Sequence, residues 1–329
     1  MASSSNKKLS IFYVLKILEK YSDENHFLTQ EDIVKKIYST YGMECERKSI
    51  GASLESLEEL GYDIVKVPRK GCFLGERNFE KSEVSYLVDA VFTSRAIPSG
   101  HARRLAEKVS SNLSMYEAKK YKYIFKADEI SRSDNKQLFY TIDVINQAIE
   151  LGKKIRFKYN KYVQNNQIEA RKNGKMYLVN PYFMVNSQGK YYLVCNYDYY
   201  DTLSNYRMEM ITDIEIVDKD IKRINEVKGY EKGINIAEYV NENIYMFGGA
   251  HVDACLRLED EKAVNYVIDW FGKNAKIYSK NNILYADIKT NEQALIYWAM
   301  QYGEVVEIIS PLSTREKMKE IINKMYKKY

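Results

Sequence analysis

The 329-residue sequence contains few cysteines, prolines and histidines. Its four cysteines lie far apart and form no CxxC pair, which favours free buried thiols in a reducing compartment over a disulfide framework. The three histidines are equally scattered, so we expect no metal site. No apolar run approaches the ~20 residues of a membrane span, and the amino terminus lacks the apolar segment of a signal peptide. We therefore expect a cytoplasmic protein without a membrane partner.

Tyrosine is the residue that stands out, with 30 copies, and it favours strands and aromatic surfaces. The length suggests two or three domains. The formal net charge of +5 permits nucleic-acid binding without requiring it. Together with the helix and strand patterns described next, these features predict a multidomain α+β protein.

Residues 1–76 read as three helices followed by a hairpin. Thr29 and Asp32 have the spacing of a capping box that opens the second helix, whose predicted buried face is Ile33, Ile37 and Tyr41. A third helix runs from about residue 46 to Gly61, and two short strands follow at 64–67 and 71–74. This order is typical of a winged helix-turn-helix domain that binds DNA.

The third helix supplies most of the candidate DNA contacts. With Ile50, Leu54 and Leu57 facing inward, small and basic side chains are left to approach the major groove, and the hairpin turn adds two more cations. The predicted DNA-binding residues are Arg47, Lys48, Ser49, Ala52, Ser53, Ser56, Arg69 and Lys70. Residues 1–76 hold twelve acidic and eleven basic side chains, so DNA binding depends on their local placement. A solvated protein-interaction module is the alternative.

Residues 77–151 have mostly helical periodicity, interrupted at 97–100 and closed by Gly152. We expect a helical linker there that serves as the dimerisation or hinge element of a homodimer. The tyrosine- and lysine-rich stretch at 116–126 has no clear period.

The apolar period changes from 3.6 to 2 at residue 153. Five short strands with tight turns, at about 154–159, 176–179, 182–185, 191–195 and 214–217, predict a small antiparallel barrel over 152–220. A connector over 221–250 leads to a β-α-β-β-α-β order over 251–329, followed by a basic helix. That order predicts a ferredoxin-like α+β module.

The predicted barrel strands interleave cations with tyrosines, which suits a ligand that carries phosphate and a stackable ring. The candidate ligand-binding residues are Arg156, Lys158, Lys175, Tyr182, Lys190, Tyr191, Tyr192 and Arg207. The alternative explanation for this alternation of charged and apolar residues is that one face of each strand is exposed to solvent and the other is buried. Strand alternation also places Tyr191 and Tyr192 on opposite faces, so one of them is expected in the core.

No catalytic constellation is recognisable in the sequence. The pair Gly248-Gly249 lacks the strand-to-helix context of a dinucleotide site, and no nucleophile and base stand at a readable spacing. We expect neither an enzyme nor a cofactor. A nucleic-acid-processing enzyme would need a cluster of metal-binding carboxylates, which the sequence does not display.

Several segments, taken in order, resemble the WYL-domain family. Residues 189–194, Gly-Lys-Tyr-Tyr-Leu-Val, are similar to the motif that names the family, with Tyr191 in place of the usual tryptophan. Residues 148–159 resemble its first strand, Asn180-Pro181-Tyr182 its second segment, and 206–211 its closing segment. The family's two closing arginines become Arg207 and Met210 here, which removes part of the expected cationic pocket. The tail from His251 resembles the extension that follows many WYL domains.

This resemblance implies a bacterial transcriptional regulator with a DNA-binding head and an Sm-like WYL barrel that senses a nucleic-acid or nucleotide-like effector. Double-stranded operator DNA would be its main partner. The alternative is an accessory protein of a CRISPR or other phage-defence locus that binds single-stranded nucleic acid or an effector protein through the barrel. Preference for duplex or single strand would separate the two.

Overall fold

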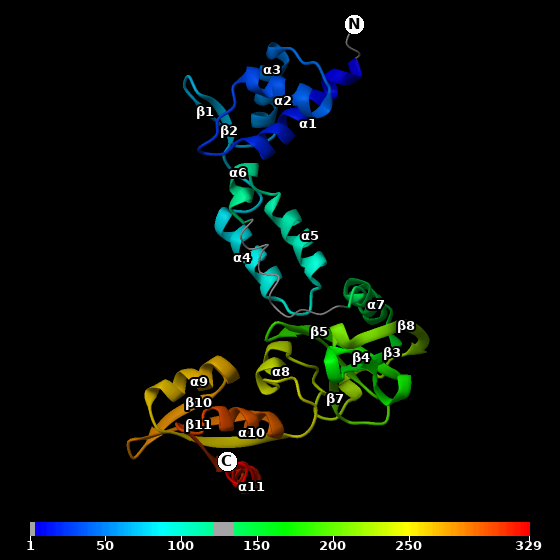
Figure 1. Cartoon of the computed structure of the whole chain (residues 1–329), viewed down its shortest axis with the longest axis vertical. Helices are drawn as coiled ribbons and strands as arrows, with labels where there is room; N and C mark the ends of the chain where they lie inside the picture. Colours follow the sequence, from blue (N-terminus) through cyan, green and yellow to red (C-terminus); the bar gives the residue numbers. More distant parts are fainter. Residues whose placement is uncertain (1–3, 122–134) are drawn as a thin grey trace. The chain divides into compact units, whose positions relative to one another are not determined.

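The computed structural model describes residues 4–121 and 135–329 (Figure 1). The chain divides into two compact units, residues 1–133 and 134–329. Helices and antiparallel sheets together confirm a mixed multidomain architecture. Within the described ranges, no helix is long and apolar enough to cross a membrane.

Three helices build the first part of the amino-terminal unit, and we call residues 4–76 the head. They are α1 (Ser4–Tyr21), α2 (Gln30–Tyr41) and α3 (Arg47–Glu59). The predicted capping box is present, with the Thr29 side chain accepting from the Asp32 backbone and Asp32 accepting in return. The prediction for Tyr41 is wrong: its side chain is 42% exposed and packs against the ring of Tyr13.

The core of the head is formed by one apolar face from each helix together with the hairpin. Its fully buried members include Val14, Ile17, Leu18, Ile33, Ile37, Ile50 and Leu57. The hairpin consists of β1 (Ile64–Val67) and β2 (Gly71–Leu74), which match the predicted strands. The backbone of Leu28 pairs with Cys72 through two hydrogen bonds of 2.9 Å, so β2 is bound on both edges. This approach needs glycine at 71, since a Cβ there would lie 2.3 Å from the Leu28 carbonyl oxygen.

The rest of the amino-terminal unit is a short helical segment. It contains α4 (Lys81–Thr93), α5 (Ser99–Ser110) and α6 (Met115–Ala118). The predicted break at 97–100 is present, with Pro98 as the N-cap of α5. Much of the stretch at 116–126 lies outside the described residues. The boundary between the two units falls inside the predicted 77–151 linker, because α7 (Leu138–Leu151) belongs to the second unit.

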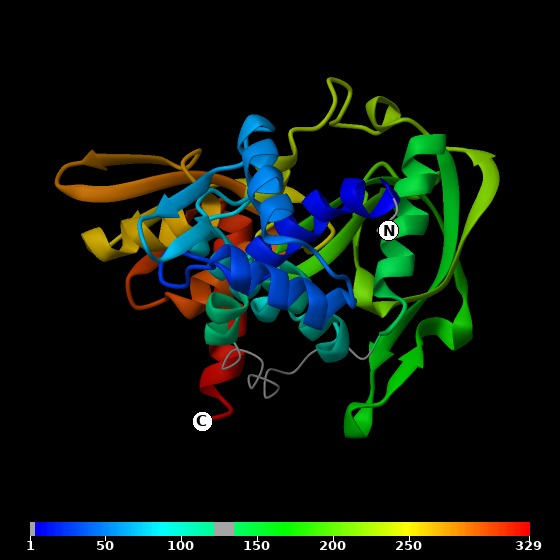
Figure 2. The same cartoon turned by 90° about the horizontal axis from the view of Figure 1, so that it is seen from above.

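A six-stranded antiparallel sheet occupies the first half of the carboxy-terminal unit. Five strands follow the order β4-β3-β5-β6-β7, and β8 pairs with the other edge of β3. The strands are β3 (Lys153–Tyr162), β4 (Ile168–Ala170), β5 (Met176–Ser187), β6 (Lys190–Asn196), β7 (Leu203–Arg207) and β8 (Ile211–Asp220). Helix α7 lies along β3, β5 and β8 (Figure 2).

The strand prediction for this sheet was incomplete. The two strands expected on either side of Pro181 are one strand, β5, which passes the proline through an irregularity in its pairing with β6. Strands β4 and β7 were not predicted at all. Both are short and carry polar side chains, so they lack a clear period-2 pattern.

The carboxy-terminal module agrees with the prediction element by element. After the short connector helix α8 (Ile236–Glu242), its strands pair in the order β10-β11-β9-β12, which places the first and third strands in the middle. Its elements are β9 (His251–Leu258), α9 (Glu261–Phe271), β10 (Lys276–Lys280), β11 (Ile283–Asn291), α10 (Glu292–Gln301), β12 (Val306–Ser310) and α11 (Leu312–Tyr326). This is the order of the predicted ferredoxin-like module.

Candidate nucleic-acid interface and effector site

Helix α3 presents a mixed outward face at its amino-terminal end. Arg47, Lys48 and Ala52 are exposed, while Ser49 and Ser56 are half-buried. Arg47 is held against α2 by its Nε, 3.1 Å from Gln30 Oε1. This geometry leaves Lys48 and the small side chains open to a partner.

Ser53 does not belong to this face, and its assignment to the DNA contacts was wrong. Its side chain is only 6% exposed, and its hydroxyl donates to the Ser49 carbonyl at 2.9 Å. The hydroxyl also lies 3.1 Å from that of Ser10 on α1. Ser53 therefore follows Ile50, Leu54 and Leu57 toward the core, as its position between them on the helix requires.

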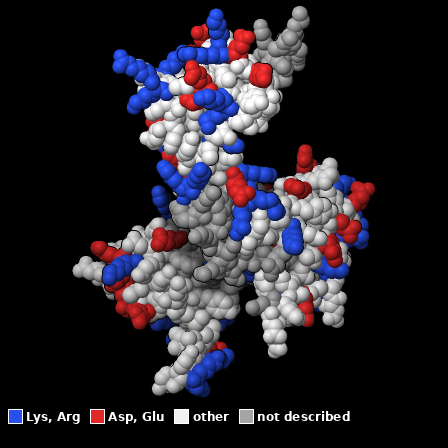
Figure 3. All heavy atoms as spheres, turned by 45° about the horizontal axis from the view of Figure 1, so that its top comes forward, with Lys and Arg blue, Asp and Glu red and all other residues white. Residues whose placement is uncertain are grey.

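The hairpin turn carries the other two predicted cations. Arg69 and Lys70 are both exposed, and Arg69 has a positive φ of 65°. The Lys70 ammonium lies 5.4 Å from the centre of the Phe27 ring, which orients its side chain. The head at the top of Figure 3 shows basic side chains interspersed with acidic ones, in agreement with the near-neutral count.

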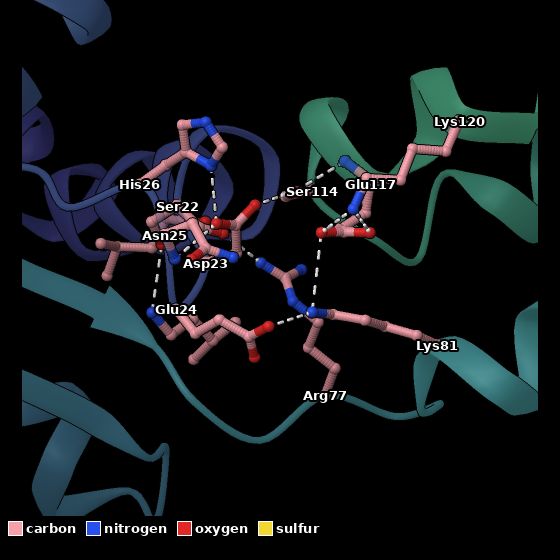
Figure 4. A network of polar contacts seen from close by, with 12 residues as sticks. Ser22, Asp23, Glu24, Asn25, His26, Arg77, Lys81, Ser114, Glu117 and Lys120 are labelled. Carbon is pink, nitrogen blue, oxygen red and sulfur yellow. Dashed lines mark hydrogen bonds and ion pairs between the residues drawn. The ribbon is translucent and has the colours of Figure 1, made fainter.

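A polar network joins the head to the helical segment, and we call it the joint (Figure 4). Asp23, 5% exposed, accepts hydrogen bonds from Ser114 Oγ, His26 Nδ1 and the Asn25 backbone. Burial opposes its ionisation, but these three donors outweigh burial and hold the pKa of Asp23 below its ordinary value. The His26 ring stacks on Tyr116 at 3.6 Å.

Arg77 is the second centre of the joint. Its guanidinium donates to the carbonyls of Glu19 at 2.8 Å, Ser22 at 2.7 Å and Asn112 at 3.4 Å. These carbonyls belong to the end of α1, the turn after it and the turn after α5. Lys81 and Lys120 pair with Glu117, which is 6% exposed. The head is thus attached to the helices by charged hydrogen bonds.

The candidate ligand residues of the six-stranded sheet are not brought together. Arg156 and Lys158 lie on β3 and pair across the sheet with Glu215 and Asp213 of β8. Lys175 is exposed at the start of β5, and Lys190 and Tyr191 lie at the turn between β5 and β6. The Tyr182 hydroxyl donates to the carbonyl of Lys222 and so binds the start of the connector to the sheet. Only Tyr192 lies beside Arg207.

Arg207 is the centre of the most unusual polar arrangement in this unit. Its Nε and Nη2 lie 2.7 Å and 2.5 Å from one oxygen, Oε1 of Glu209. The Arg207 side chain is 31% exposed, whereas the Glu209 side chain is 1% exposed. Burial opposes the charge on Arg207, but Glu209 outweighs burial and raises the pKa of the guanidinium. The other oxygen, Glu209 Oε2, is buried without a hydrogen-bond partner among the described residues.

Tyrosines flank this ion pair, and with it they form what we call the Arg207 site. Tyr192 is the cross-strand neighbour of Arg207 and is 8% exposed. The Arg207 backbone donates to the Tyr159 hydroxyl at 3.3 Å, and Arg171 lies 5.7 Å from the centre of the Tyr159 ring. Burial raises the pKa of both tyrosine hydroxyls, so they stay protonated at neutral pH. The site combines two guanidinium groups, two aromatic rings and one half-satisfied carboxylate.

Sequence reasoning missed three of these residues: Glu209, Tyr159 and Arg171. Glu209 lies two residues after Arg207. An acidic residue so close to a candidate anion-binding arginine indicates an ion pair between them. Arg171 precedes a turn and gave no signal. Met210, the position of the family's second arginine, is 4% exposed and packs in the core.

Neither a metal-ligand cluster nor a disulfide is found among the described residues. No group of three or more histidine, cysteine, aspartate or glutamate side chains could hold a metal ion there. All four cysteines are free.

Comparison with known proteins yields one family match and distant structural similarities. Residues 140–216 match the WYL domain model. Proteasome accessory factor B/C (PafBC) of Arthrobacter aurescens is 16% identical over 95% of this chain and 48% of its own, with a TM-score of 0.32. This chain thus spans about half of PafBC. A CRISPR Cas-related protein is 15% identical over 98% of this chain and 92% of its own, with a TM-score of 0.39. No curated protein matches.

Proposed function

We propose that this protein, which carries a WYL domain at residues 140–216, is a transcriptional regulator that binds duplex DNA through its head and senses an anionic, nucleotide-like effector at the Arg207 site. It would act as a cytoplasmic homodimer without enzymatic activity. The observation that carries the proposal is the pairing of half-exposed Arg207 with buried, half-satisfied Glu209.

The head supports the DNA-binding part of the proposal. Three helices followed by a hairpin have the order of a winged helix-turn-helix, in which the amino-terminal residues of the third helix read the major groove. Lys48 and Arg47 lie there, and Arg69 and Lys70 lie at the turn of the wing, where they would meet the phosphate backbone. Local cations of this kind can support binding although the head as a whole is near neutral.

The Arg207 site supports the sensing part. In this sheet, read as the Sm-like barrel of the WYL domain, an effector phosphate would compete with the Glu209 carboxylate for the same guanidinium. Tyr159 and Tyr192 would offer hydroxyls and ring edges to a base. Exchange of an internal anion for an external one gives two arrangements of the site, and coupling to DNA needs the effector to favour one of them.

Duplex titration tests the DNA-binding part. The full chain is titrated against labelled duplex from its own upstream region, at two salt concentrations. We expect salt-sensitive binding that falls about tenfold or more in Arg47→Ala/Lys48→Ala, since each lost phosphate or base contact costs about 1 kcal/mol or more. Lys16→Ala/Lys20→Ala is the matched control, because it removes the same charge from α1. Equal losses in both pairs would reduce the effect to bulk charge and contradict the proposal.

A second candidate function is an accessory protein of a CRISPR or other phage-defence locus that binds single strands through the sheet. The near-neutral head favours it, because such a head could serve as a docking module. A matched single strand in the same titration separates the two. Preference for the single strand, lost in Arg207→Gln/Glu209→Gln and kept in Arg47→Ala/Lys48→Ala, would favour the accessory protein. The double glutamine variant leaves neither buried charge without its partner.

A further inference from the structure

The four-stranded sheet of the carboxy-terminal module has one covered and one open face. Helices α9 and α10 cover the face formed by Ala254, Leu256 and Leu258, which are at most 3% exposed. Strand alternation turns Asp253, Cys255 and Arg257 to the opposite face, where all three are exposed or half-buried. The connector helix α8 borders one part of this open face. Its Glu238, Asn241 and Glu242 line a pocket together with Asp253, Cys255 and Asp287, and Glu242 pairs with Lys289 at 2.9 Å.

A row of four register partners crosses the middle of the open face. Tyr278 of β10 is opposite Tyr285 of β11, Tyr285 is opposite Arg257 of β9, and Arg257 is opposite Glu307 of β12. The two tyrosine rings are stacked, with centroids 5.7 Å apart and an interplanar angle of 20°. The Arg257 guanidinium is 2.7 Å from Glu307 and remains 42% exposed. The row therefore presents two aligned rings followed by a cation.

Two lysines flank the first ring of this row. Lys276 and Lys280 lie two residues before and after Tyr278, so all three side chains point to the same face of the edge strand. Both lysines are exposed. Among the residues that the structure describes, neither forms an ion pair. Two acids of this face are already engaged, since Asp287 accepts from the Tyr278 hydroxyl at 3.3 Å and Glu307 is bound by Arg257 and Arg315. A third, Asp253, is exposed on β9 opposite Lys289.

We propose that this open face, formed by Tyr278, Tyr285, Arg257, Lys276 and Lys280 and called here the tyrosine platform, binds a segment of single-stranded nucleic acid. Bases stack on the two rings, and the phosphates between them meet the lysines and the arginine. Stacking on aromatic side chains of a four-stranded sheet of this kind is an established means of binding unpaired bases. The platform is separate from the Arg207 site and needs neither that site nor the head.

The composition of the face favours this occupant over a protein. A stable protein interface needs an apolar core within about 800 Å² on each partner. The platform instead alternates rings with charges, and its one exposed aliphatic neighbour on β11 is Ile283, at the strand end. In a duplex the faces of the bases are stacked on one another, so they cannot stack on the two tyrosine rings. A flexible single strand can use rings and cations together.

The test measures the affinity of the full chain for a labelled oligothymidylate of about eight nucleotides by fluorescence anisotropy. All proteins carry Arg207→Gln/Glu209→Gln, so the Arg207 site does not contribute. Tyr278→Ala/Tyr285→Ala is expected to lower the affinity about tenfold or more, because each base stacked on an aromatic ring contributes substantially to binding. Tyr278→Phe/Tyr285→Phe keeps the rings and is expected to keep the affinity. Tyr326→Ala is the matched control, since that tyrosine is 84% exposed on α11.

Three results would overturn the tyrosine platform. One is equal affinity of the alanine pair and its parent, with thermal unfolding showing both folded. Another is equal affinity for an abasic strand of the same length, which would leave charge alone as the cause. The third is a change in sedimentation of the alanine pair without a change in strand affinity, which would identify a contact between copies. None of them affects duplex binding by the head or effector binding at the Arg207 site.

Discussion

The two units each contain a buried carboxylate with an arginine nearby, Asp23 with Arg77 and Glu209 with Arg207, and the hydrogen-bonding capacity of the two carboxylates is satisfied very differently. In the joint, Asp23 receives hydrogen bonds on both oxygens, from Ser114, His26 and the Asn25 backbone. At the Arg207 site, one oxygen of Glu209 accepts both hydrogen bonds from Arg207. The other oxygen is buried and has no hydrogen-bond partner among the described residues.

The difference separates a structural carboxylate from one that suits a changeable site. A buried polar atom without a partner costs about 1–3 kcal/mol, so a fully satisfied group resists rearrangement. Glu209 is already destabilised in this way by its unpaired oxygen. A ligand that lets the carboxylate reorient and form a further hydrogen bond would remove part of that destabilisation. We therefore expect the joint to be rigid and the Arg207 site to be responsive.

The largest expected effect follows from breaking the joint. Asp23→Ala removes the acceptor of the Ser114 hydroxyl and of the Asn25 backbone amide. Ser114 is only 1% exposed, so water cannot easily replace the lost acceptor. We expect the free energy of unfolding of the amino-terminal unit to fall by about 2–3 kcal/mol, measured by urea denaturation.

Glu24→Gln is the matched control for the joint. Glu24 is the next residue along and forms only an exposed ion pair with Lys81. We expect a loss of less than about 1 kcal/mol. If both variants lose the same amount, the joint is not a special attachment.

The two halves of the Arg207 pair are expected to differ in cost. Arg207→Gln strands a carboxylate that is 1% exposed, whereas Glu209→Gln leaves a guanidinium that is 31% exposed and can be hydrated. We expect losses of about 2 kcal/mol and about 1 kcal/mol in unfolding free energy, with the double variant below their sum. Arg156→Gln, which breaks an exposed pair with Glu215, is the control. The reverse order would show that Glu209 is better solvated than its burial implies.

Removal of the internal anion is expected to strengthen effector binding. With Glu209→Gln, a nucleotide phosphate no longer competes with a carboxylate for Arg207. We expect the affinity for ATP, used as a probe and measured by calorimetry, to rise about tenfold, which is about 1.4 kcal/mol. Glu215→Gln removes the same charge from an exposed pair and should change little. An unchanged affinity in Glu209→Gln would mean that ATP binds elsewhere or not at all.

The smallest effect is the pH dependence of the joint. The pKa of Asp23 is lowered in the folded state, so its contribution to stability is complete above its unfolded pKa of about 4 and is lost as the pH falls through the folded value. We expect the difference in unfolding free energy between the native chain and Asp23→Ala to shrink between pH 5 and pH 3, by less than about 1.4 kcal/mol per pH unit. A difference that grows in acid would contradict the direction of the shift.

Where local pattern decides the structure, the fold could be predicted from the sequence. The hairpin strands agree with the prediction because Gly71 and the turn residues mark their ends. The carboxy-terminal module agrees because Asp260 and Asn291 mark the starts of α9 and α10 as capping residues, and Pro311 precedes α11. The resemblance to the WYL domain is likewise confirmed for residues 140–216, which match the model of that domain.

The sites were harder to predict, because their contacts join residues far apart in sequence. The bond from Ser114 to Asp23 spans 91 positions, and no spacing rule relates them. Glu209 is close to Arg207 in sequence, but its burial depends on the surrounding strands and on α7. Ser53 was misplaced because a small polar residue reads as a surface residue until its neighbours Ser10 and Ser49 are known.

The three carbonyls that Arg77 holds also bear on the geometry of an operator. Because they belong to α1, the turn after it and the turn after α5, the head cannot swivel against the helices without giving up charged hydrogen bonds. If two copies were held together through this helical segment, each head would keep its orientation relative to the contact between the copies. Such a dimer would be expected to bind half-sites a whole helical turn apart better than half-sites offset by about 5 base pairs.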